Sequence, residues 1–312
     1  MIGVGGCWAQ SVKDEVFRRF PFVDVAFGPG QVHKLAEFLT SDQITAQGFF
    51  EFEGFTGHLP AKRQRPRQAW VQIAVGCNMA CSYCIVPSVR GRERSRTPRD
   101  LLAEVTALAA DGVREVTLLG QNVNAYGRDL AKDERMTFAE LLRAVAAVEG
   151  IARVRYTSPH PKDMKADVIA AMAETPEVCS HLHLPVQSGS TDVLRRMRRT
   201  YSRERYLDLV HRLRAAMPDL SLTTDIIVGF PGETDADFEQ TMSLVREVRY
   251  DGAYTFVYSA RPGTEAAETM DDDVSPETKR ERITALVELV QEIARERSAR
   301  FVGTTGEVLV EG

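Results

Sequence analysis

The sequence predicts an α/β fold in which six strand–helix repeats form a parallel sheet that curls into a partial (β/α)6 barrel. Apolar runs typical of strands alternate with helical patterns from Ala69 onward. Polar or glycine-bearing turns such as GQN and GFPGE follow many of these strands. The length of 312 residues accommodates a barrel domain of roughly 200 to 250 residues plus smaller pieces.

The elements of this barrel can be placed in order along the chain. The strands are expected at Ala69–Val75, Glu115–Leu119, Arg153–Thr157, His181–Val186, Ser221–Val228 and Ala253–Tyr258. The helices are expected at Pro98–Ala110, Phe138–Val148, Lys162–Ala173, Thr191–Met197 with Arg203–Ala216, and Asp235–Val248, and a long charged helix over about Pro276–Arg300 closes the region. Since the loops after the strand carboxyl ends carry the chemistry in such folds, we expect the site there.

The segment before the barrel is expected to hold a small α/β unit. A short strand over Met1–Gly6 ends at Cys7, a helix follows over Val12–Arg19, and an extended piece lies at Val23–Phe27. The stretch Thr45–Arg67 lacks periodicity and contains prolines, glycines and a basic cluster, which is typical of a linker.

The composition restricts the class of protein. Apolar residues make up 44% of the chain and the formal net charge is −5, so a generic nucleic-acid binder is not indicated and any RNA contact needs a local basic patch. No apolar run approaches the roughly 20 residues needed to cross a bilayer, and the N-terminus does not resemble a secretory signal. Five cysteines in such a chain favour a reducing cytoplasm and a metal site over a disulfide scaffold.

Three cysteines crowd into the stretch GCNMACSYCIV with the spacing C-x3-C-x2-C: Cys77, Cys81 and Cys84. Thiolates are soft ligands that suit zinc or iron–sulfur clusters. Zinc needs a fourth ligand, and the nearest downstream histidine is His160, whereas a [4Fe–4S] cluster on three cysteines leaves one iron open for a substrate. A zinc site completed from far along the chain, or a group of buried cysteines, are the alternatives.

This motif at the end of the first barrel strand, with Tyr83 before the last cysteine, resembles the radical S-adenosylmethionine (SAM) superfamily. In that superfamily the open iron binds the amino and carboxylate groups of SAM, and reduction of the cluster yields a 5′-deoxyadenosyl radical. The resemblance implies that Cys77, Cys81 and Cys84 ligate the cluster and act in catalysis. It also implies that Tyr83 packs near the adenine end of SAM.

Six motifs in order narrow the resemblance. They are GCNMACSYCIVPSVRGRERSR, LLGQNVNAYG, TSPHP, HLHLPVQSGS, TDIIVGFPGET and YSARPGT. Together they are similar to the methylthiotransferase family, and most similar to its MiaB-type tRNA enzymes, over nearly the whole chain. The resemblance implies addition of a methylthio group to C2 of N6-isopentenyladenosine beside the anticodon. One SAM donates a methyl group, another generates the radical that removes the C2 hydrogen, and a second cluster supplies sulfur.

Two departures from the family pattern concern the ends of the chain. Family members hold the second [4Fe–4S] cluster with three N-terminal cysteines, and only Cys7 matches, as the third of them; without the family it is equally a small buried residue. They also end in a small RNA-binding, TRAM-like β-barrel, of which FVGTTGEVLVEG resembles only the first strand. We therefore expect a chain truncated at both ends, which cleaves SAM reductively but does not complete sulfur insertion. Residues 1–62 would be a remnant of the N-terminal methylthiotransferase domain plus linker, 63–300 the radical SAM core, and 301–312 the start of the C-terminal domain.

Residues after the later strands are candidates for binding SAM, each with a structural alternative. They are Gly120, Gln121, Asn122, Gln187, Ser188, Asp225 and Gly229. The GQN turn offers amides for the amino or carboxylate group, or is only a turn. The QS pair offers groups for ribose hydroxyls, or its serine caps a helix. The strand that carries the aspartate can read the adenine edge with its backbone, or its loop only starts the next helix.

Three further residues carry weaker signals. Arg261 after the last strand can meet a carboxylate or phosphate, or is a solvated charge. His160, between two prolines, can line the substrate pocket, or only satisfies its loop. Cys179 has no partner motif and is expected in the core.

Two arginine-rich runs, VRGRERSR and RRMRRTYSRER, are candidates for contact with RNA phosphates. The alternative is a solvated helical face with Glu–Arg pairs. Because the second run has few acidic neighbours in the sequence, we expect Arg195, Arg196 and Arg198 to contact RNA.

The sequence leaves three hypotheses for function. The leading one is the tRNA methylthiotransferase, a cytoplasmic monomer without membrane contact that uses SAM, two [4Fe–4S] clusters in the full-length protein and a reducing electron donor such as a flavodoxin or ferredoxin. The second keeps the chemistry but changes the substrate to threonylcarbamoyladenosine in tRNA or to an aspartate of a ribosomal protein. The third is a zinc-stabilised RNA-binding module without catalysis, which metal analysis would distinguish by zinc in place of iron and sulfide.

Overall fold

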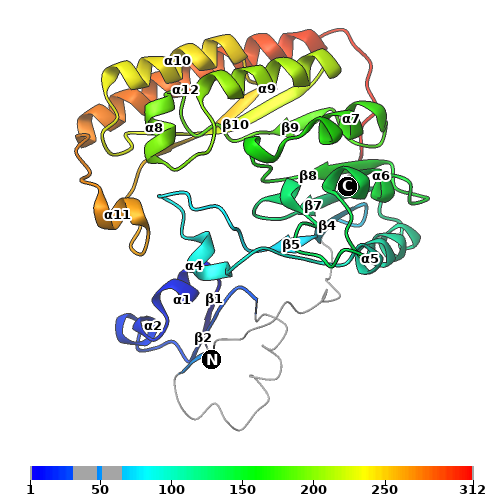
Figure 1. The fold of residues 1–312 in the computed structure, drawn as a ribbon, viewed down its shortest axis with the longest axis horizontal. Coiled ribbons are helices and arrows are strands. Elements are labelled where there is room, and N and C mark those ends of the chain that lie inside the picture. Colours follow the sequence, from blue (N-terminus) through cyan, green and yellow to red (C-terminus); the bar gives the residue numbers. More distant parts are fainter. Residues whose placement is uncertain (1, 31–47, 51–64, 311–312) are drawn as a thin grey trace.

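A six-stranded parallel sheet forms the centre of the molecule, as the strand–helix repeats predict. The computed structural model of the chain describes residues 2–30, 48–50 and 65–310. The strands are β4 (Gln68–Gln72), β7 (Glu115–Leu119), β8 (Arg153–Tyr156), β9 (His181–His183), β10 (Ser221–Val228) and β11 (Gly252–Val257). β4, β7 and β8 pair in parallel, as do β9, β10 and β11, and a parallel bridge from Val154 in β8 to Val178 joins the two halves. The sheet therefore follows the chain order and curls into a partial barrel (Figure 1).

Helices cover the outer face of the sheet. They are α5 (Pro98–Ala110), α6 (Phe138–Ala146), α7 (Ala166–Glu174), α8 (Thr191–Arg196), α9 (Arg203–Ala216), α10 (Asp235–Val248) and α12 (Pro276–Ser298). The short helix α11 (Glu265–Thr269) lies instead at the open end of the barrel, and the loops contain the 3-10 turns η2 (Val123–Ala125), η3 (Pro161–Asp163) and η4 (Ala299–Phe301). The sequence sets many of their starts, because a Ser or Thr side chain accepts a backbone N–H at the first turn. These caps are Thr97, Thr137, Ser190, Ser202, Thr234 and Ser275.

The alternation of residues in β10 shows how the two faces of the sheet differ. Leu222, Ile226 and Val228 are fully buried toward the helices, whereas Asp225 and Ile227 are only half-buried on the concave face. Because successive side chains of a strand point to opposite faces, one face of the sheet packs in the core and the other stays open. The concave face can therefore admit a ligand.

The first strand is interrupted where the sequence predicts one run over 69–75. β4 ends at Gln72, and β5 (Ala74–Val75) pairs instead with β6 (Arg94–Ser95) in an antiparallel ladder. Ile73 lies between them: its N–H donates to the carbonyl of Leu119 and its own carbonyl accepts from Arg96. This switch of partner directs the chain out of the sheet and toward the motif that holds three cysteines.

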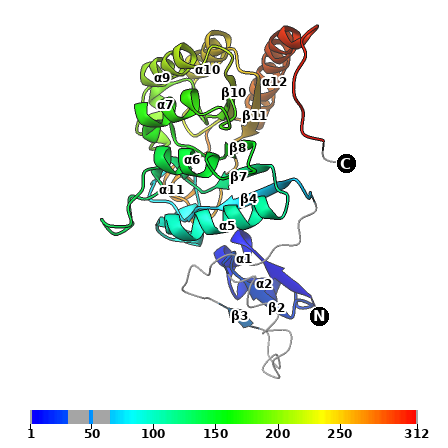
Figure 2. The same cartoon turned by 90° about the vertical axis from the view of Figure 1, so that its right-hand side faces the viewer.

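A small parallel sheet precedes the barrel (Figure 2). It contains β1 (Gly3–Gly5), β2 (Val25–Phe27) and β3 (Gly48–Phe50). The expected helix over 12–19 is replaced by α1 (Cys7–Val12) and α2 (Glu15–Arg19), because Lys13 between them has a left-handed φ of 48°. β3 lies in the stretch expected to be a linker, of which residues 51–64 are outside the described ranges.

The C-terminal stretch forms no strand over the described residues 302–310. A strand needs a paired neighbour for its backbone groups, and none of the described strands pairs with this segment. The carbonyl of Glu307 instead accepts a hydrogen bond from Arg153 of β8. The division into three domains stays a prediction. None of the helices described is long and apolar enough to span a membrane.

Candidate metal centre

The loop with the three cysteines begins directly after β5. Gly76 has φ +82°, and a methyl group there would lie 2.1 Å from the carbonyl oxygen of Arg92, so only glycine fits. The N–H of Cys77 donates to the carbonyl of Gly91 at 3.1 Å. The segment just before β6 therefore holds the first cysteine in place.

The three thiols are half-buried and free of disulfides: Cys77, Cys81 and Cys84. The N–H of Cys84 donates to the carbonyl of Cys81, so the last two cysteines share a tight turn. Burial raises the pKa of Cys77 to about 11 and also raises the pKa of Cys84. Thiols of this kind stay protonated near neutral pH unless a metal displaces the proton.

Residues from the far half of the barrel hold the other side of this loop. Ser82 is buried, its N–H donates to the carbonyl of Met197, and its hydroxyl donates to the carbonyl of Arg196. The carbonyl of Ser82 accepts from Ala266 in α11. The loop thus spans the open end of the barrel, from the first strand to the elements after β9 and β11.

Tyr83 lies within this loop and points to the segment after β10. Its ring packs edge-on against Phe230, with centroids 6.4 Å apart. Burial raises the pKa of Tyr83 far above its ordinary value, so the hydroxyl stays neutral. Arg261, which we expected near a carboxylate or phosphate, is exposed, and its charge acts on Cys84.

Arg199 is the nearest fixed cation to the cysteines. Its Nη1 lies 3.6 Å from the sulfur of Cys81, Nη2 donates to the carbonyl of Pro185, and Nε donates to the hydroxyl of Tyr201. In the sequence this arginine belongs to a basic run, and no local signal shows its position at the site. Cys81 is 118 residues away in the chain, so only the closure of the barrel brings the two together.

The GQN turn after β7 supports the cysteine loop. Gln121 Oε1 accepts from the N–H of Gly76 at 2.7 Å, and Gly120 is buried against Val123. Asn122 is 3% exposed and donates to Asp163, whereas its Oδ1 has no hydrogen-bond partner among the described residues. Of the three, Asn122 therefore has an acceptor left for a ligand.

Gln187 and Ser188, after β9, differ in what they offer. Gln187 adopts a left-handed φ of 73° between backbone bonds to Asp225 and Ile227, an unusual conformation for a residue other than glycine. Ser188 is fully buried and close to Thr241. The alternative in which Ser188 caps the next helix is therefore wrong, whereas binding of a ribose hydroxyl stays a prediction.

The cap of α8 is Ser190, because its hydroxyl accepts from the N–H of Val193 inside the helix, whereas the hydroxyl of Ser188 accepts from the N–H of Ser190 before the helix. Asp225 extends from β10 on the concave face, with Oδ1 3.2 Å from Nε2 of His183. Asp225 thus remains half-exposed at the open side of the sheet.

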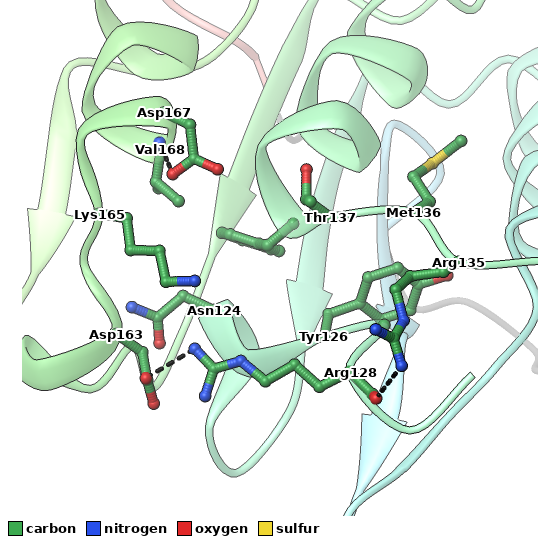
Figure 3. Close-up of a pocket in the computed structure, with 12 residues that line it drawn as sticks. Asn124, Tyr126, Arg128, Arg135, Met136, Thr137, Asp163, Lys165, Asp167 and Val168 are labelled. Atoms are coloured by element: carbon green, nitrogen blue, oxygen red, sulfur yellow. Dashed lines mark hydrogen bonds and ion pairs between the residues drawn. The ribbon is translucent and has the colours of Figure 1, made fainter. Parts of the chain in front are cut away.

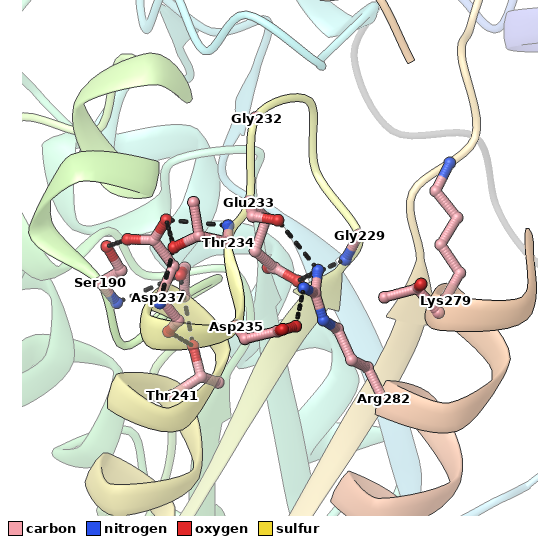
Figure 4. A network of polar contacts seen from close by, with 12 residues as sticks. Ser190, Gly229, Gly232, Glu233, Thr234, Asp235, Asp237, Thr241, Lys279 and Arg282 are labelled. Atoms are coloured by element: carbon pink, nitrogen blue, oxygen red, sulfur yellow. Dashed lines mark hydrogen bonds and ion pairs between the residues drawn. The ribbon is translucent and has the colours of Figure 1, made fainter. Parts of the chain in front are cut away.

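A buried ion-pair network fixes the loop after β10 (Figure 4). Glu233 accepts from the N–H of Gly229 at 2.9 Å and from Nη1 of Arg282 in α12 at 2.8 Å. Gly229 has φ +69°, and a methyl group there would lie 2.4 Å from the Lys279 side chain. The N–H of Gly229 is therefore already bound to Glu233. The left-handed conformation of Gly229 allows the close packing against Lys279 in this loop.

The arginines expected to contact RNA differ in their surroundings. Arg195 is exposed and pairs with Asp192, and Arg198 is exposed and pairs with Glu265. Arg196 is half-buried, and its Nη2 donates to the carbonyl of Gly232. The run has few acidic neighbours in the sequence, but the fold brings one to it. Glu265, which is distant in the sequence, lies 2.6 Å from Arg198.

Cys7 lies at the start of α1, next to the helix that follows the three-cysteine motif. Nε of Arg90, the last residue of α4 (Val86–Arg90), is 3.4 Å from the sulfur of Cys7. Figure 1 shows α1 beside α4. Cys179, expected in the core, is half-buried.

His160 is buried and belongs to the loop after β8. Burial first, and then the charge of Arg199, lower the pKa of His160 to about 3. Its Nδ1 accepts from the N–H of Lys162, and its backbone N–H donates to Asn124. His160 therefore acts as a neutral residue that satisfies its loop.

Two cavities flank Arg128. A cavity of about 630 Å³ is bounded by the cysteine loop and by residues that include Glu93, Lys162 and Arg198. A second cavity, of about 230 Å³, lies toward the start of α6 (Figure 3). The guanidinium of Arg128 pairs with Asp163 at 2.6 Å and lines both.

The sequence profile described as the radical SAM superfamily matches residues 71–245, more than half of the chain. The chain belongs to the radical SAM superfamily. Membership implies a [4Fe–4S] cluster and SAM. The matched residues of this radical SAM chain run from β4 through α10 and include the three-cysteine loop.

Curated relatives match nearly the whole of this radical SAM chain. A tRNA-2-methylthio-N(6)-dimethylallyladenosine synthase from Acidothermus cellulolyticus is 54% identical over 99% of this chain and 62% of its own length. The synthase of the same name from Streptomyces coelicolor is 50% identical over 99% of this chain and 61% of its own length. The chain thus spans about three-fifths of the length of these relatives.

Solved structures share the fold. Coproporphyrinogen III oxidase from Escherichia coli, a radical SAM enzyme, has a TM-score of 0.55 at 19% identity, over 73% of this chain and 53% of its own. The radical SAM methyltransferase TsrM from Kitasatospora setae has a TM-score of 0.52 at 16% identity, over 64% of this chain and 38% of its own. At such identities the likeness concerns the fold alone.

The residues of the radical SAM core fit an iron–sulfur cluster in their chemistry. The three thiols are free, half-buried and soft, and a fixed guanidinium lies beside one of them. Within the described ranges, no three His, Cys, Asp or Glu side chains are arranged to hold one metal ion. In a four-iron cluster each thiolate binds a different iron, so the sulfurs need not converge on one point.

Proposed function

We propose that this chain carries the radical SAM core of a tRNA methylthiotransferase, which adds a methylthio group to C2 of N6-isopentenyladenosine beside the anticodon. The observation that carries the proposal is the half-buried loop with Cys77, Cys81 and Cys84 across the open end of the barrel. The relatives named as tRNA-2-methylthio-N(6)-dimethylallyladenosine synthases, at 54% and 50% identity, support this choice of substrate.

In this proposal Cys77, Cys81 and Cys84 hold the radical SAM cluster. When bound, the cluster would supply one electron for the reductive cleavage of SAM. An external donor such as a flavodoxin or ferredoxin would provide that electron. The protein positions the cofactor and shields it from water. Ser82 and Gly76 fix the two ends of the loop, so the thiols are preorganised for the cluster.

The polar groups around the loop are suited to the polar end of SAM. Arg199 offers a fixed guanidinium for a carboxylate, a pairing that favours arginine geometrically. Asn122 offers its unpaired Oδ1 to an amino group. Arg199 contacts Cys81 directly, and Asn122 follows Gln121, which binds the N–H of Gly76 at the start of the loop.

Residues of the later strands would hold the nucleoside part. Asp225 is a residue of β10, and Gln187 lies beside it: the N–H of Gln187 donates to the carbonyl of Asp225 at 2.8 Å. Tyr83 and Phe230 offer an apolar wall for the adenine. Gly120, Ser188 and Gly229 act through the backbone shape of the loops, since Ser188 is buried and the Gly229 N–H is occupied.

Cys7 would ligate the second, sulfur-donating cluster, for which the whole protein would supply two further cysteines. Its place beside Arg90, at the end of α4, supports this role, because α4 follows directly on Cys84. Residues 1–312 alone should then cleave SAM without completing sulfur insertion. Methylthio-modified tRNA produced by this chain alone would contradict that part of the proposal.

tRNA is the proposed partner, contacted by Arg195 in α8 and by Arg198 just after this helix. Arg196 is assigned a positioning role, because it donates to the carbonyl of Gly232. The hypothesis of a zinc-stabilised module has no observation in its favour.

The test of the proposed function is modification of tRNA in cells. A deletion strain should lose 2-methylthio-N6-isopentenyladenosine, measured by mass spectrometry of tRNA nucleosides, and accumulate N6-isopentenyladenosine. Loss of a methylthiolated threonylcarbamoyladenosine instead would move the assignment to the other tRNA branch. An unchanged nucleoside profile would remove tRNA as the substrate.

A further inference from the structure

The cavity of about 630 Å³ adjoins the cysteine loop and is lined by charges of both signs. Asn78, Met79 and Ala80, which separate Cys77 from Cys81, form one wall. Arg128, Lys162 and Arg198 stand exposed around it, as does Asp129, and Glu93 is the half-buried acid. A ligand here would therefore lie against the loop that carries the proposed cluster.

Glu93 is fixed beside this loop by Asn78. The Asn78 amide donates to Glu93 Oε2 at 3.2 Å, and the Glu93 backbone N–H donates to Asn78 Oδ1, also at 3.2 Å. The other carboxylate oxygen, Oε1, is shielded from solvent and forms no well-aligned hydrogen bond in the described part of the chain, although the side chain of Asn122 lies near the carboxylate. A buried carboxylate oxygen without a donor costs free energy, which a bound N–H group removes.

Glu93 lines the cavity, so its carboxylate is part of the cavity wall. The terminal torsion of glutamate is broad, so a partial rotation can turn Oε1 toward a ligand without a change of backbone. Burial raises the pKa of Glu93, with a contact to Asn122 opposing the shift. Carboxyls perturbed in this way cluster at functional sites.

We propose that Glu93 is a specificity-determining residue that accepts the N6–H of the adenosine to be modified, while Lys162 and Arg198 contact the flanking phosphates. This inference rests on the proposed function and deepens it. It predicts a substrate with one N–H and a neutral N6 substituent. A carboxylate in this place would repel the anionic threonyl group of threonylcarbamoyladenosine or an aspartate side chain.

The charges around the cavity agree with a nucleotide ligand. Lys162 has no ion-pair partner among the described residues, and Arg198, which also lines the cavity, has a left-handed φ of 55°. Its pairing with Glu265 is exposed, at 2.6 Å, and such pairs are weak enough to exchange for a phosphate. The cavity thus joins an N–H acceptor to cations at its mouth.

Two groups can donate an N–H to Glu93: N6 of the nucleobase and the amino group of SAM. Measuring the binding of RNA and of SAM separately distinguishes them. Anticodon stem-loop RNA is prepared with N6-isopentenyladenosine, which has one N6–H, or with its N6-methyl derivative, which has none. Binding of each RNA to the anaerobically reconstituted chain is measured by fluorescence anisotropy, for wild type, Glu93→Ala and Glu93→Gln. SAM binding without RNA is measured by equilibrium dialysis on the same proteins.

Wild type is expected to prefer the RNA with the N6–H by about tenfold or more, as one charge-assisted hydrogen bond allows. Glu93→Ala should abolish this preference, and Glu93→Gln should reduce it while leaving SAM affinity within about twofold. Glu149→Gln, an exposed glutamate at the opposite end of the strands, is the matched control and should behave as wild type.

Two results would overturn the inference. If the preference survives in Glu93→Ala, the methyl group is excluded by shape and Glu93 does not read the N–H. If SAM affinity falls more than tenfold while the RNA preference persists, the donor is the amino group of SAM. Absence of RNA binding by wild type would count against the proposed tRNA substrate, a failure that is distinct from either result.

Discussion

Nη1 of Arg199 lies 3.6 Å from the sulfur of Cys81, and the same guanidinium donates to the carbonyl of Pro185 and to the hydroxyl of Tyr201. A guanidinium is a rigid fork that can serve three partners in fixed directions, whereas an ammonium on a flexible stem cannot. The structure thus places a positive charge of fixed orientation against the candidate cluster loop.

We expect Arg199→Lys to lower SAM affinity by about 10- to 100-fold, the usual effect of a lost supporting group at a metal site. Equilibrium dialysis of SAM against the reconstituted protein measures this, with iron and sulfide content determined in parallel. Arg205→Lys, an exposed arginine of α9, should have no effect. Unchanged SAM affinity in Arg199→Lys would show that the guanidinium only supports the loop.

Reversing the charge of Arg195 and Arg198 to glutamate should weaken RNA binding and flatten its dependence on salt. Each phosphate contact contributes roughly 0.7 to 0.9 to the slope of log K against log salt. Binding of an anticodon stem-loop is measured at several salt concentrations. Arg212→Glu with Arg246→Glu changes the charge equally on exposed faces of α9 and α10. An equal effect of both pairs would show that only net charge matters.

Arg282→Met should destabilise the protein by about 3 to 5 kcal/mol, because it leaves the buried carboxylate of Glu233 without its partner. The side chains of Arg282 and Glu233 are 6% and 1% exposed. Urea unfolding of the cluster-free protein measures the change in free energy. Arg246→Met breaks an exposed pair with Glu239 and should cost less than about 1 kcal/mol. A similar small loss for Arg282→Met would contradict the buried network.

His160 should make the protein less stable in mild acid. The unfolded histidine binds a proton below about pH 6.5, whereas the folded one, with a pKa of about 3, stays neutral. The unfolded state therefore binds more protons between these two pH values. As the pH is lowered to 5, the free energy of unfolding decreases by about 2 kcal/mol. The difference in unfolding free energy between pH 7.5 and pH 5 should shrink by that amount in His160→Gln. It should not shrink in His211→Gln, an exposed control; equal behaviour would place His160 in contact with water.

Much of the barrel could be predicted from the sequence, because its periodicity and its caps are local signals. Strands 115–119 and 221–228 and helices 98–110, 203–216 and 235–248 lie where the pattern places them. Partner changes could not be predicted. β5 leaves the sheet for β6 because of a pairing with a strand some 20 residues later, which no local pattern encodes.

The candidate site was predicted in part. The three-cysteine loop and Asn122 lie together because they follow adjacent strands of one sheet. Arg199 and Glu93 were not identified, because an arginine in a basic run and a glutamate among arginines look like solvated charges. Only their burial and their contacts across the barrel distinguish Arg199 and Glu93 from solvated charges. The same holds for Arg196, for which the sequence predicts RNA contact and which donates to the carbonyl of Gly232 in the structure.

The most direct test of the central claim is release of 5′-deoxyadenosine after anaerobic iron–sulfide reconstitution, with SAM and a strong reductant. The variant with Cys77, Cys81 and Cys84 all changed to alanine runs beside wild type, and Cys179→Ala serves as a cysteine control. We expect release by wild type and by Cys179→Ala, with iron and sulfide bound, and none by the triple variant. No release by wild type, with zinc bound in place of iron, would contradict the assignment of a radical SAM cluster to this loop.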